Sequence, residues 1–149
     1  MLSYTYKWLL ITILLTLPLA GCTPAPDEAQ ITEHIHAMAH GIEARQSDEI
    51  LDRLNEAFRS SRLKDKKEVN RLLMLSFLKY KNISILLTNI QVVFDATYQN
   101  RAQATFNAVA TSSSGLIPHD GQIYQLDSQW EKRDGDWYMQ ALEWKRSFE

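Results

Sequence analysis

Three histidines near the start of the chain are spaced so that two of them could ligate a metal ion. His36 and His40 are four residues apart and would share one face of a helix, with His34 close by. A zinc site needs at least a third protein ligand, for which only Glu33 or Glu43 is at hand, and no HExxH or cysteine–histidine spacing is present. We therefore expect a polar helix face, with no metal and no cofactor.

Other arrangements that carry chemistry are missing from the sequence. It has no glycine-rich phosphate loop and no Ser/His/Asp or Cys/His set, which argues against nucleotide binding and acyl transfer. The net charge of the 149 residues is −2, and no basic stripe indicates nucleic acid as a partner.

One carboxylate near the C-terminus is a candidate acid or base, and its position depends on a hairpin. The dipeptide Asp-Gly at 134–135 predicts a two-residue turn between two strands. That turn would place Trp130 opposite Met139, and Leu126 opposite Glu143. In an apolar pocket the pKa of Glu143 would rise, so that the group could act as an acid or base. A position at the rim, or a pairing with arginine, is the alternative.

The two faces of this hairpin differ in polarity. The more apolar face is predicted to line a pocket, and its members are Tyr124, Leu126, Trp130, Trp137, Met139 and Glu143. The opposite face mixes apolar and polar side chains and is predicted to form a homodimer interface, since apolar groups rimmed by polar ones mark interfaces. Its proposed anchors are Ile123, Tyr138, Leu142 and Trp144.

Cys22 is the single cysteine of the chain, so no disulfide can form within it. It follows an apolar run at 8–17, which is too short to span a bilayer and is preceded by the charge of Lys7. A basic start, an apolar run and small residues before the cut are typical of a secretory signal. The sequence predicts a signal peptide over 1–21 and a tether over 22–27.

The four residues 19–22, Leu-Ala-Gly-Cys, resemble the lipobox of bacterial lipoproteins. The resemblance implies that the Cys22 thiol is lipidated and becomes the first residue of the mature chain. Two or three acyl chains give stable attachment to a membrane. Thr23, in place of the aspartate that tends to retain lipoproteins in the inner membrane, implies the outer membrane, with the domain facing the periplasm.

The elements that position these residues are three helices and then four strands. Apolar residues at helical spacing predict a helix from Asp27, a second over 47–58 and a third from near Asp65. Strands are expected over 83–94, 97–111, 122–133 and 136–146, with a loop over 112–121. This order predicts an α+β fold in which the helices cover one face of a curved antiparallel sheet.

The element order and the closing hairpin, WEKRDGDWY at 130–138, resemble the nuclear transport factor 2-like superfamily, which includes SnoaL-like cyclases and ketosteroid isomerases. The resemblance covers about residues 28–147 and implies a cone with a pocket between helices and sheet, in a domain over 28–149. Ketosteroid isomerase chemistry needs a pocket aspartate, a tyrosine and a protonated aspartate, and the expected inner stripe of the first helix has no tyrosine.

Two functions stay open at this point. The first is a non-catalytic binding or assembly module with a periplasmic protein as partner. The second is a pocket protein for a small apolar ligand, acting as a carrier or as an isomerase- or cyclase-like enzyme. A deep pocket with Glu143 at its base would favour the second function, and a filled cone would favour the first.

Overall fold

The computed structural model describes residues 26–113 and 119–147. Within these residues the elements are α2 (Asp27–Ala44), α3 (Ser47–Leu51), β1 (Leu54–Arg59), α4 (Lys66–Lys79), β2 (Asn82–Phe94), β3 (Arg101–Ser113), β4 (His119–Arg133) and β5 (Asp136–Arg146). The sheet has the strand order β1-β5-β4-β3-β2. Pairs β2–β3, β3–β4 and β4–β5 are antiparallel, and β1–β5 is parallel. The predicted α+β fold, with helices on a curved sheet, is confirmed.

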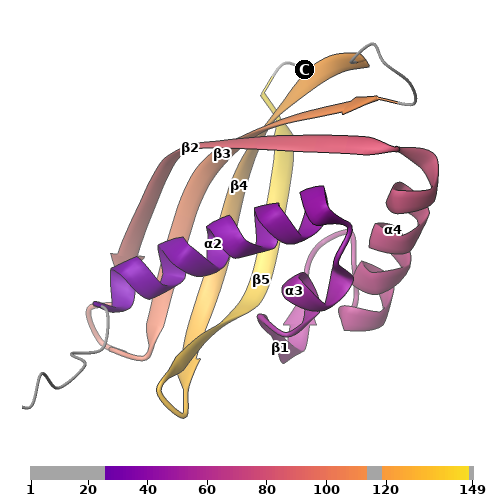
Figure 1. Cartoon of the computed structure of the whole chain (residues 1–149). Helices are drawn as coiled ribbons and strands as arrows, with labels where there is room; N and C mark the ends of the chain where they lie inside the picture. Colours follow the sequence, from indigo (N-terminus) through magenta and orange to yellow (C-terminus); the bar gives the residue numbers. More distant parts are fainter. Residues whose placement is uncertain (1–25, 114–118, 148–149) are drawn as a thin grey trace, which may run out of the picture.

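Helix α2 lies across the concave face of the sheet, and α4 lies beyond its C-terminal end (Figure 1). The stripe Ile31, Ile35 and Met38 recurs at spacings of four and three, and all three side chains are buried. They pack against the inner faces of β3, β4 and β5, where Trp130 and Met139 are also buried. The apolar stripe therefore fixes which side of α2 meets the sheet.

Helix α4 begins where the sequence predicts a helix, near Asp65. The Asp65 carboxylate accepts a hydrogen bond from the backbone N–H of Glu68 at 2.9 Å, which makes it an N-cap. The inner side of the helix buries Val69 and Phe77. Its remaining leucines are distributed between the pocket and the surface.

Gly41 allows α2 and α3 to approach closely. A Cβ at this position would lie 2.6 Å from Cβ of Glu49 and 2.9 Å from Cδ1 of Ile50. We expect Gly41→Ala to lower the free energy of unfolding by about 1–3 kcal/mol, because overpacking outweighs the helix-forming advantage of alanine. Chemical denaturation measures the change. Ala37→Gly, on the same helix, is a control that removes a methyl group instead, and equal stability of Gly41→Ala and wild type would contradict the packing.

The predicted second helix over 47–58 is wrong in its second half. Helix α3 ends at Leu51, and Leu54 and Phe58 belong to strand β1. The four-residue spacing of these two side chains suits a helix, but β1 is irregular, with a register shift against β5 between Leu54 and Arg59. Both side chains are buried by this arrangement. Pairing with β5 therefore decides the structure where the local pattern was ambiguous.

The predicted hairpin register is correct near the turn and wrong beyond a β-bulge. Trp130 pairs with Met139 as expected, but Gln129 pairs with Ala141, so that Gln140 is an extra residue in β5. Because side chains alternate along a strand, every later residue of β5 points to the opposite face from the one predicted. Leu126 therefore pairs with Trp144 instead of Glu143.

The predicted signal peptide and Cys22 lie outside the described residues, as does most of the tether. Among the residues that the structure describes, no helix is long and apolar enough to cross a membrane.

Candidate functional site

A cavity of about 310 Å³ lies between the helices and the inner face of the sheet. This volume is at the lower end of the roughly 300–1,000 Å³ that is usual for small-molecule pockets. Its lining draws on α2, α3, α4 and all five strands. The cavity thus occupies the place where the resemblance drawn from the sequence implies a pocket.

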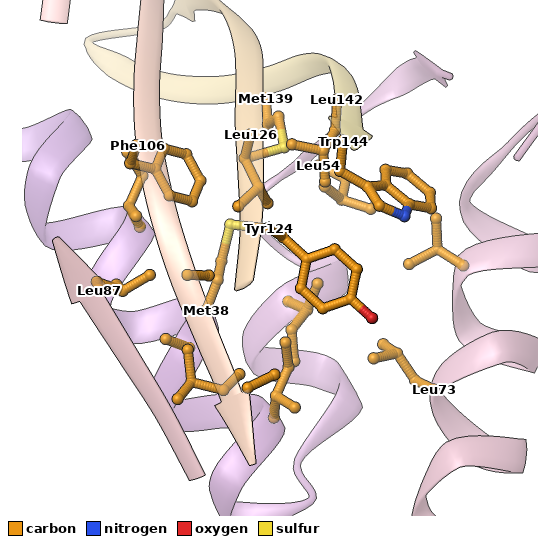
Figure 2. A pocket seen from close by; sticks show the side chains of 18 of the residues that line it. Met38, Leu54, Leu73, Leu87, Phe106, Tyr124, Leu126, Met139, Leu142 and Trp144 are labelled. Carbon is orange, nitrogen blue, oxygen red and sulfur yellow. The ribbon is translucent and has the colours of Figure 1, made fainter. Parts of the chain in front are cut away.

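The walls of the cavity are aliphatic and aromatic. Figure 2 shows Met38, Phe106, Leu126, Leu142 and Trp144 gathered around one space. Every described lining residue is apolar except for the hydroxyl of Tyr124 and the indole N–H of Trp144. An apolar cavity of this kind stays dry or takes an apolar ligand.

The space exists because β3 presents small side chains to α2. Ala102, Ala104, Ala108 and Ala110 alternate on the inner face of the strand and are interrupted only by Phe106. Ala108 and Ala110 line the cavity directly. The alternating alanines were visible in the sequence, and they are the signal that could have located the cavity.

Two of the residues predicted to line the pocket do not border the cavity. Trp130 and Trp137, both predicted to line the pocket, are 1% and 0% exposed and belong to the packed core. The indole Nε1 of Trp130 donates to Oγ of Ser128 at 2.9 Å, and Ser128 Oγ in turn donates to the carbonyl of Ala104 at 3.0 Å. These tryptophans belong to the core and are not part of the cavity lining.

Aromatic side chains on β4 and β5 lie toward the end of the cavity next to α4. Tyr124 points toward Leu73 of α4 (Figure 2), and its hydroxyl donates to the side-chain oxygen of Gln122. The guanidinium of Arg62 lies 5.3 Å from the ring centroid of Trp144. Tyr124, Leu126 and Met139 line the cavity as the sequence predicts.

Glu143 does not face the cavity. The bulge at Gln140 turns it outward, where its carboxylate accepts hydrogen bonds from the backbone N–H of Ser61 at 2.6 Å and from the Ser61 hydroxyl. The prediction that Glu143 is a carboxylate inside the pocket is therefore wrong. Glu143 is exposed, and its hydrogen bonds hold the segment that follows β1. Leu142 and Trp144, predicted to face outward, line the cavity instead.

The outer face of the sheet loses Leu142 and Trp144, two of the four anchors expected for a homodimer, because both side chains line the cavity. Of the four predicted anchors, Ile123 and Tyr138 keep outward positions in the register and are half-buried. The large apolar side chains most exposed on this face are Leu86 and Val93.

Of the three histidines, the structure gives a contact only to His34. Its Nε2 lies 2.9 Å from Oδ1 of Asp136, and its ring stacks on Trp130 with centroids 6.1 Å apart. His36 and His40 are exposed on α2. Within the described residues, no group of three histidine, cysteine, aspartate or glutamate side chains could hold a metal ion.

Two aspartates hold α2 to the closing hairpin. Asp27 lies 2.6 Å from Nζ of Lys132, and this hydrogen bond lowers the pKa of Asp27. Burial alone would raise the pKa of Asp136, but hydrogen bonds from His34 and from the backbone N–H of Trp137 outweigh burial and lower it. Both carboxylates thus stabilise the fold in their charged form.

The free energy of unfolding is expected to fall at acid pH, because the carboxyl groups of Asp27 and Asp136 become protonated. A carboxyl whose pKa is lower in the folded state stabilises the fold above its unfolded pKa, near 3.9, and the contribution is lost as the pH falls through the folded value. Asp27→Asn/Asp136→Asn should be less stable than wild type at pH 7 and should lose less stability below about pH 5. Denaturation curves across pH test this, and parallel curves for the two proteins would contradict it.

A second hollow, of about 420 Å³, lies beside the bulge. Its lining includes the polar side chains of Gln103, Gln129 and Gln140, and the Gln103 amide donates a hydrogen bond to Asp127 at 2.7 Å. We assign the candidate site to the apolar cavity, where a ligand gains most from leaving water.

Comparison with known proteins defines the class of fold. No family model matches the chain, and no curated protein is similar to it in sequence. Among solved structures, it is similar to a protein from Streptomyces avermitilis assigned as a dehydratase of the nuclear transport factor 2-like family, with a TM-score of 0.72 and 14% identity, over 85% of this chain and 100% of that one.

Two further structures show the range of proteins with this architecture. A hexachlorocyclohexane dehydrochlorinase from Novosphingobium barchaimii has a TM-score of 0.68 and 13% identity, over 80% of this chain and 86% of that one. A protein of unknown function with a cystatin-like fold from Nostoc punctiforme has a TM-score of 0.67 and 12% identity, over 83% and 93%. The chain thus has a nuclear transport factor 2-like, cystatin-like fold.

Proposed function

We propose that the domain binds a small apolar molecule in the cavity under α2 and α4 and does not transform it. The supporting observation is the cavity lining. Its described side chains are apolar, and only Tyr124 and Trp144 contribute polar atoms. Each methylene of a ligand that leaves water for such a site contributes about 0.8 kcal/mol. A binding or carrier protein needs no more chemistry than this.

Catalysis by a dehydratase or dehydrochlorinase, as two of the structural neighbours are named, is the alternative. Elimination of that kind removes a proton from carbon and needs a base within hydrogen-bond reach of the substrate. The hydroxyl of Tyr124 and the indole of Trp144 are not basic near pH 7. Glu143, the candidate base, points away from the cavity. The lining therefore supports binding over catalysis.

The apolar probe N-phenyl-1-naphthylamine tests the proposed function. We expect saturable binding at one site per chain, with a rise in probe fluorescence, and displacement by apolar compounds that fit the cavity. Trp144→Ala should weaken binding because Trp144 forms part of the wall. Binding that does not saturate, or that is unchanged in this variant, would contradict the proposal.

We further propose that the domain is anchored through a lipidated Cys22 to the outer membrane, facing the periplasm. The Leu-Ala-Gly-Cys sequence and Thr23 support this. Cys22→Ser should abolish incorporation of a palmitate analogue and release the protein from the membrane fraction, because the acyl chains supply the attachment. A wild-type protein that takes up no label would contradict the anchor.

A homodimer through the outer face of the sheet is a separate proposal. It now depends on Ile123 and Tyr138, with the exposed Leu86 and Val93 beside them on the same face. Sedimentation of the domain at micromolar concentration tests it, and a wild-type monomer would exclude it.

A further inference from the structure

The outward side of α4 carries large apolar side chains that the domain leaves uncovered. Leu72, Met74, Leu75 and Leu78 are 45%, 56%, 55% and 81% exposed. They fall within seven residues on a helix whose inner side is already occupied by Val69 and Phe77. Exposed apolar groups gathered in this way mark an interaction surface.

Basic side chains are interleaved with these apolar groups. Arg71 precedes Leu75 by four residues, and Lys67 precedes Arg71 by four, so the three share one side of the helix. Both basic residues are exposed and make no ion pair with any residue in the described ranges. We call Lys67, Arg71, Leu72, Met74, Leu75, Leu78 and Lys79 the α4 outer face.

The charge of this region opposes that of the rest of the chain. Residues 62–81 contain seven basic and two acidic side chains, whereas the whole chain has a net charge of −2. Two copies that met through this face would bring positive charge against positive charge, which disfavours self-association. A surface with clustered negative charge and an apolar interior complements the face.

The α4 outer face also adjoins the cavity. Leu72 is both exposed on α4 and part of the cavity lining, and its neighbour Leu73 lines the cavity as well. Helix α4 lies at the end of the molecule beyond the C-terminal end of α2 (Figure 1). Whatever the face contacts is therefore close to the α4 side of the apolar site.

We propose that the α4 outer face docks on an anionic lipid bilayer. Its leucines and methionine enter the boundary between headgroups and acyl chains, and Lys67, Arg71 and Lys79 contact the anionic headgroups. This places the α4 side of the cavity next to lipid, where an apolar ligand would be exchanged. That last consequence rests on the proposed function, but the docking itself does not.

Flotation with vesicles tests the docking without the contribution of an anchor. The chain from Thr23 onward is used, since it carries every described element and the whole described core, and its cooperative melting is checked first. We expect it to bind vesicles that contain phosphatidylglycerol more tightly than vesicles of phosphatidylcholine, and to be released by high salt. Leu75→Gln/Leu78→Gln should weaken binding by about tenfold or more.

Matched variants distinguish vesicle binding by the α4 outer face from nonspecific binding by any exposed apolar side chain. Leu86→Gln/Val93→Gln removes two apolar side chains of comparable exposure, 62% and 67%, from the outer face of the sheet and should bind vesicles like wild type. Lys67→Gln/Arg71→Gln should lose the preference for anionic lipid. Equal losses in both leucine-containing variants, or no binding by wild type, would overturn the proposal.

These measurements would also detect a binding partner other than lipid at the α4 outer face. Self-association or capture of a protein through Leu75 and Leu78, without vesicle binding, would overturn lipid docking. Probe binding in the absence of vesicles is measured in parallel. Vesicle binding without probe binding would uphold the docking and contradict the proposed function, whereas the reverse result would do the opposite.

Discussion

Replacing Trp137 with alanine is expected to lower the free energy of unfolding by about 3–5 kcal/mol, which is a large part of the roughly 5–15 kcal/mol available to a domain. Trp137 is fully buried, and its ring lies 5.8 Å from that of Phe94. The residue belongs to the packed core, so its removal leaves a buried void. Urea denaturation followed by circular dichroism measures the loss.

Trp144→Ala is the matched control for this loss. Trp144 is half-buried and borders an existing cavity, so its removal enlarges a space that is already open. We expect it to cost less than half as much stability as Trp137→Ala and to act mainly on ligand binding. Equal destabilisation by the two variants would contradict the division into a packed core and an open cavity.

Ala108→Phe is expected to weaken the binding of N-phenyl-1-naphthylamine by about tenfold or more, because a benzyl group would occupy the space that the ligand needs. Ala108 lines the cavity from β3, and its small side chain helps to create the volume of about 310 Å³. The melting temperature should be unchanged or higher, since the new ring buries apolar surface in an existing void.

Val109→Phe places the same side chain on the opposite face of the same strand. Val109 pairs with Leu86 and Ile123 in the register of the outer face. This control should bind the probe like wild type. If Ala108→Phe melts at a lower temperature, Ala110→Leu supplies a smaller filling of the same wall. Unchanged affinity in a folded Ala108→Phe protein would place the ligand elsewhere.

Elements with a strong, regular pattern could be predicted from the sequence. The stripe of α2, the start of α4 near Asp65 and the Asp-Gly turn are each marked by a local pattern, and each is found in the fold. Strand β1 could not be found in this way, because its pairing with β5 joins residues far apart in the chain. Its two buried apolar residues fit a helix equally well.

The faces of β5 show why the candidate site was only partly predictable. The apolar residues Trp137 and Met139 occupy odd positions, and Leu142 and Trp144 occupy even ones. The switch of apolar residues from odd to even positions indicates a bulge. In a strand without a bulge, the same sequence would instead predict two apolar faces. The single extra residue at Gln140 moves two apolar side chains into the cavity and Glu143 out of it. The prediction of Glu143 as an acid or base in the pocket failed because the sequence analysis did not include this bulge.

Native mass spectrometry of the protein as purified tests the central claim most directly, because it detects a bound molecule without assuming its identity. Wild type should carry one noncovalent apolar ligand per chain, and Ala108→Phe should carry none, while Val109→Phe keeps the ligand. Wild-type protein that is free of ligand as isolated, and that takes up nothing from a total lipid extract, would contradict the claim that the cavity is a binding site.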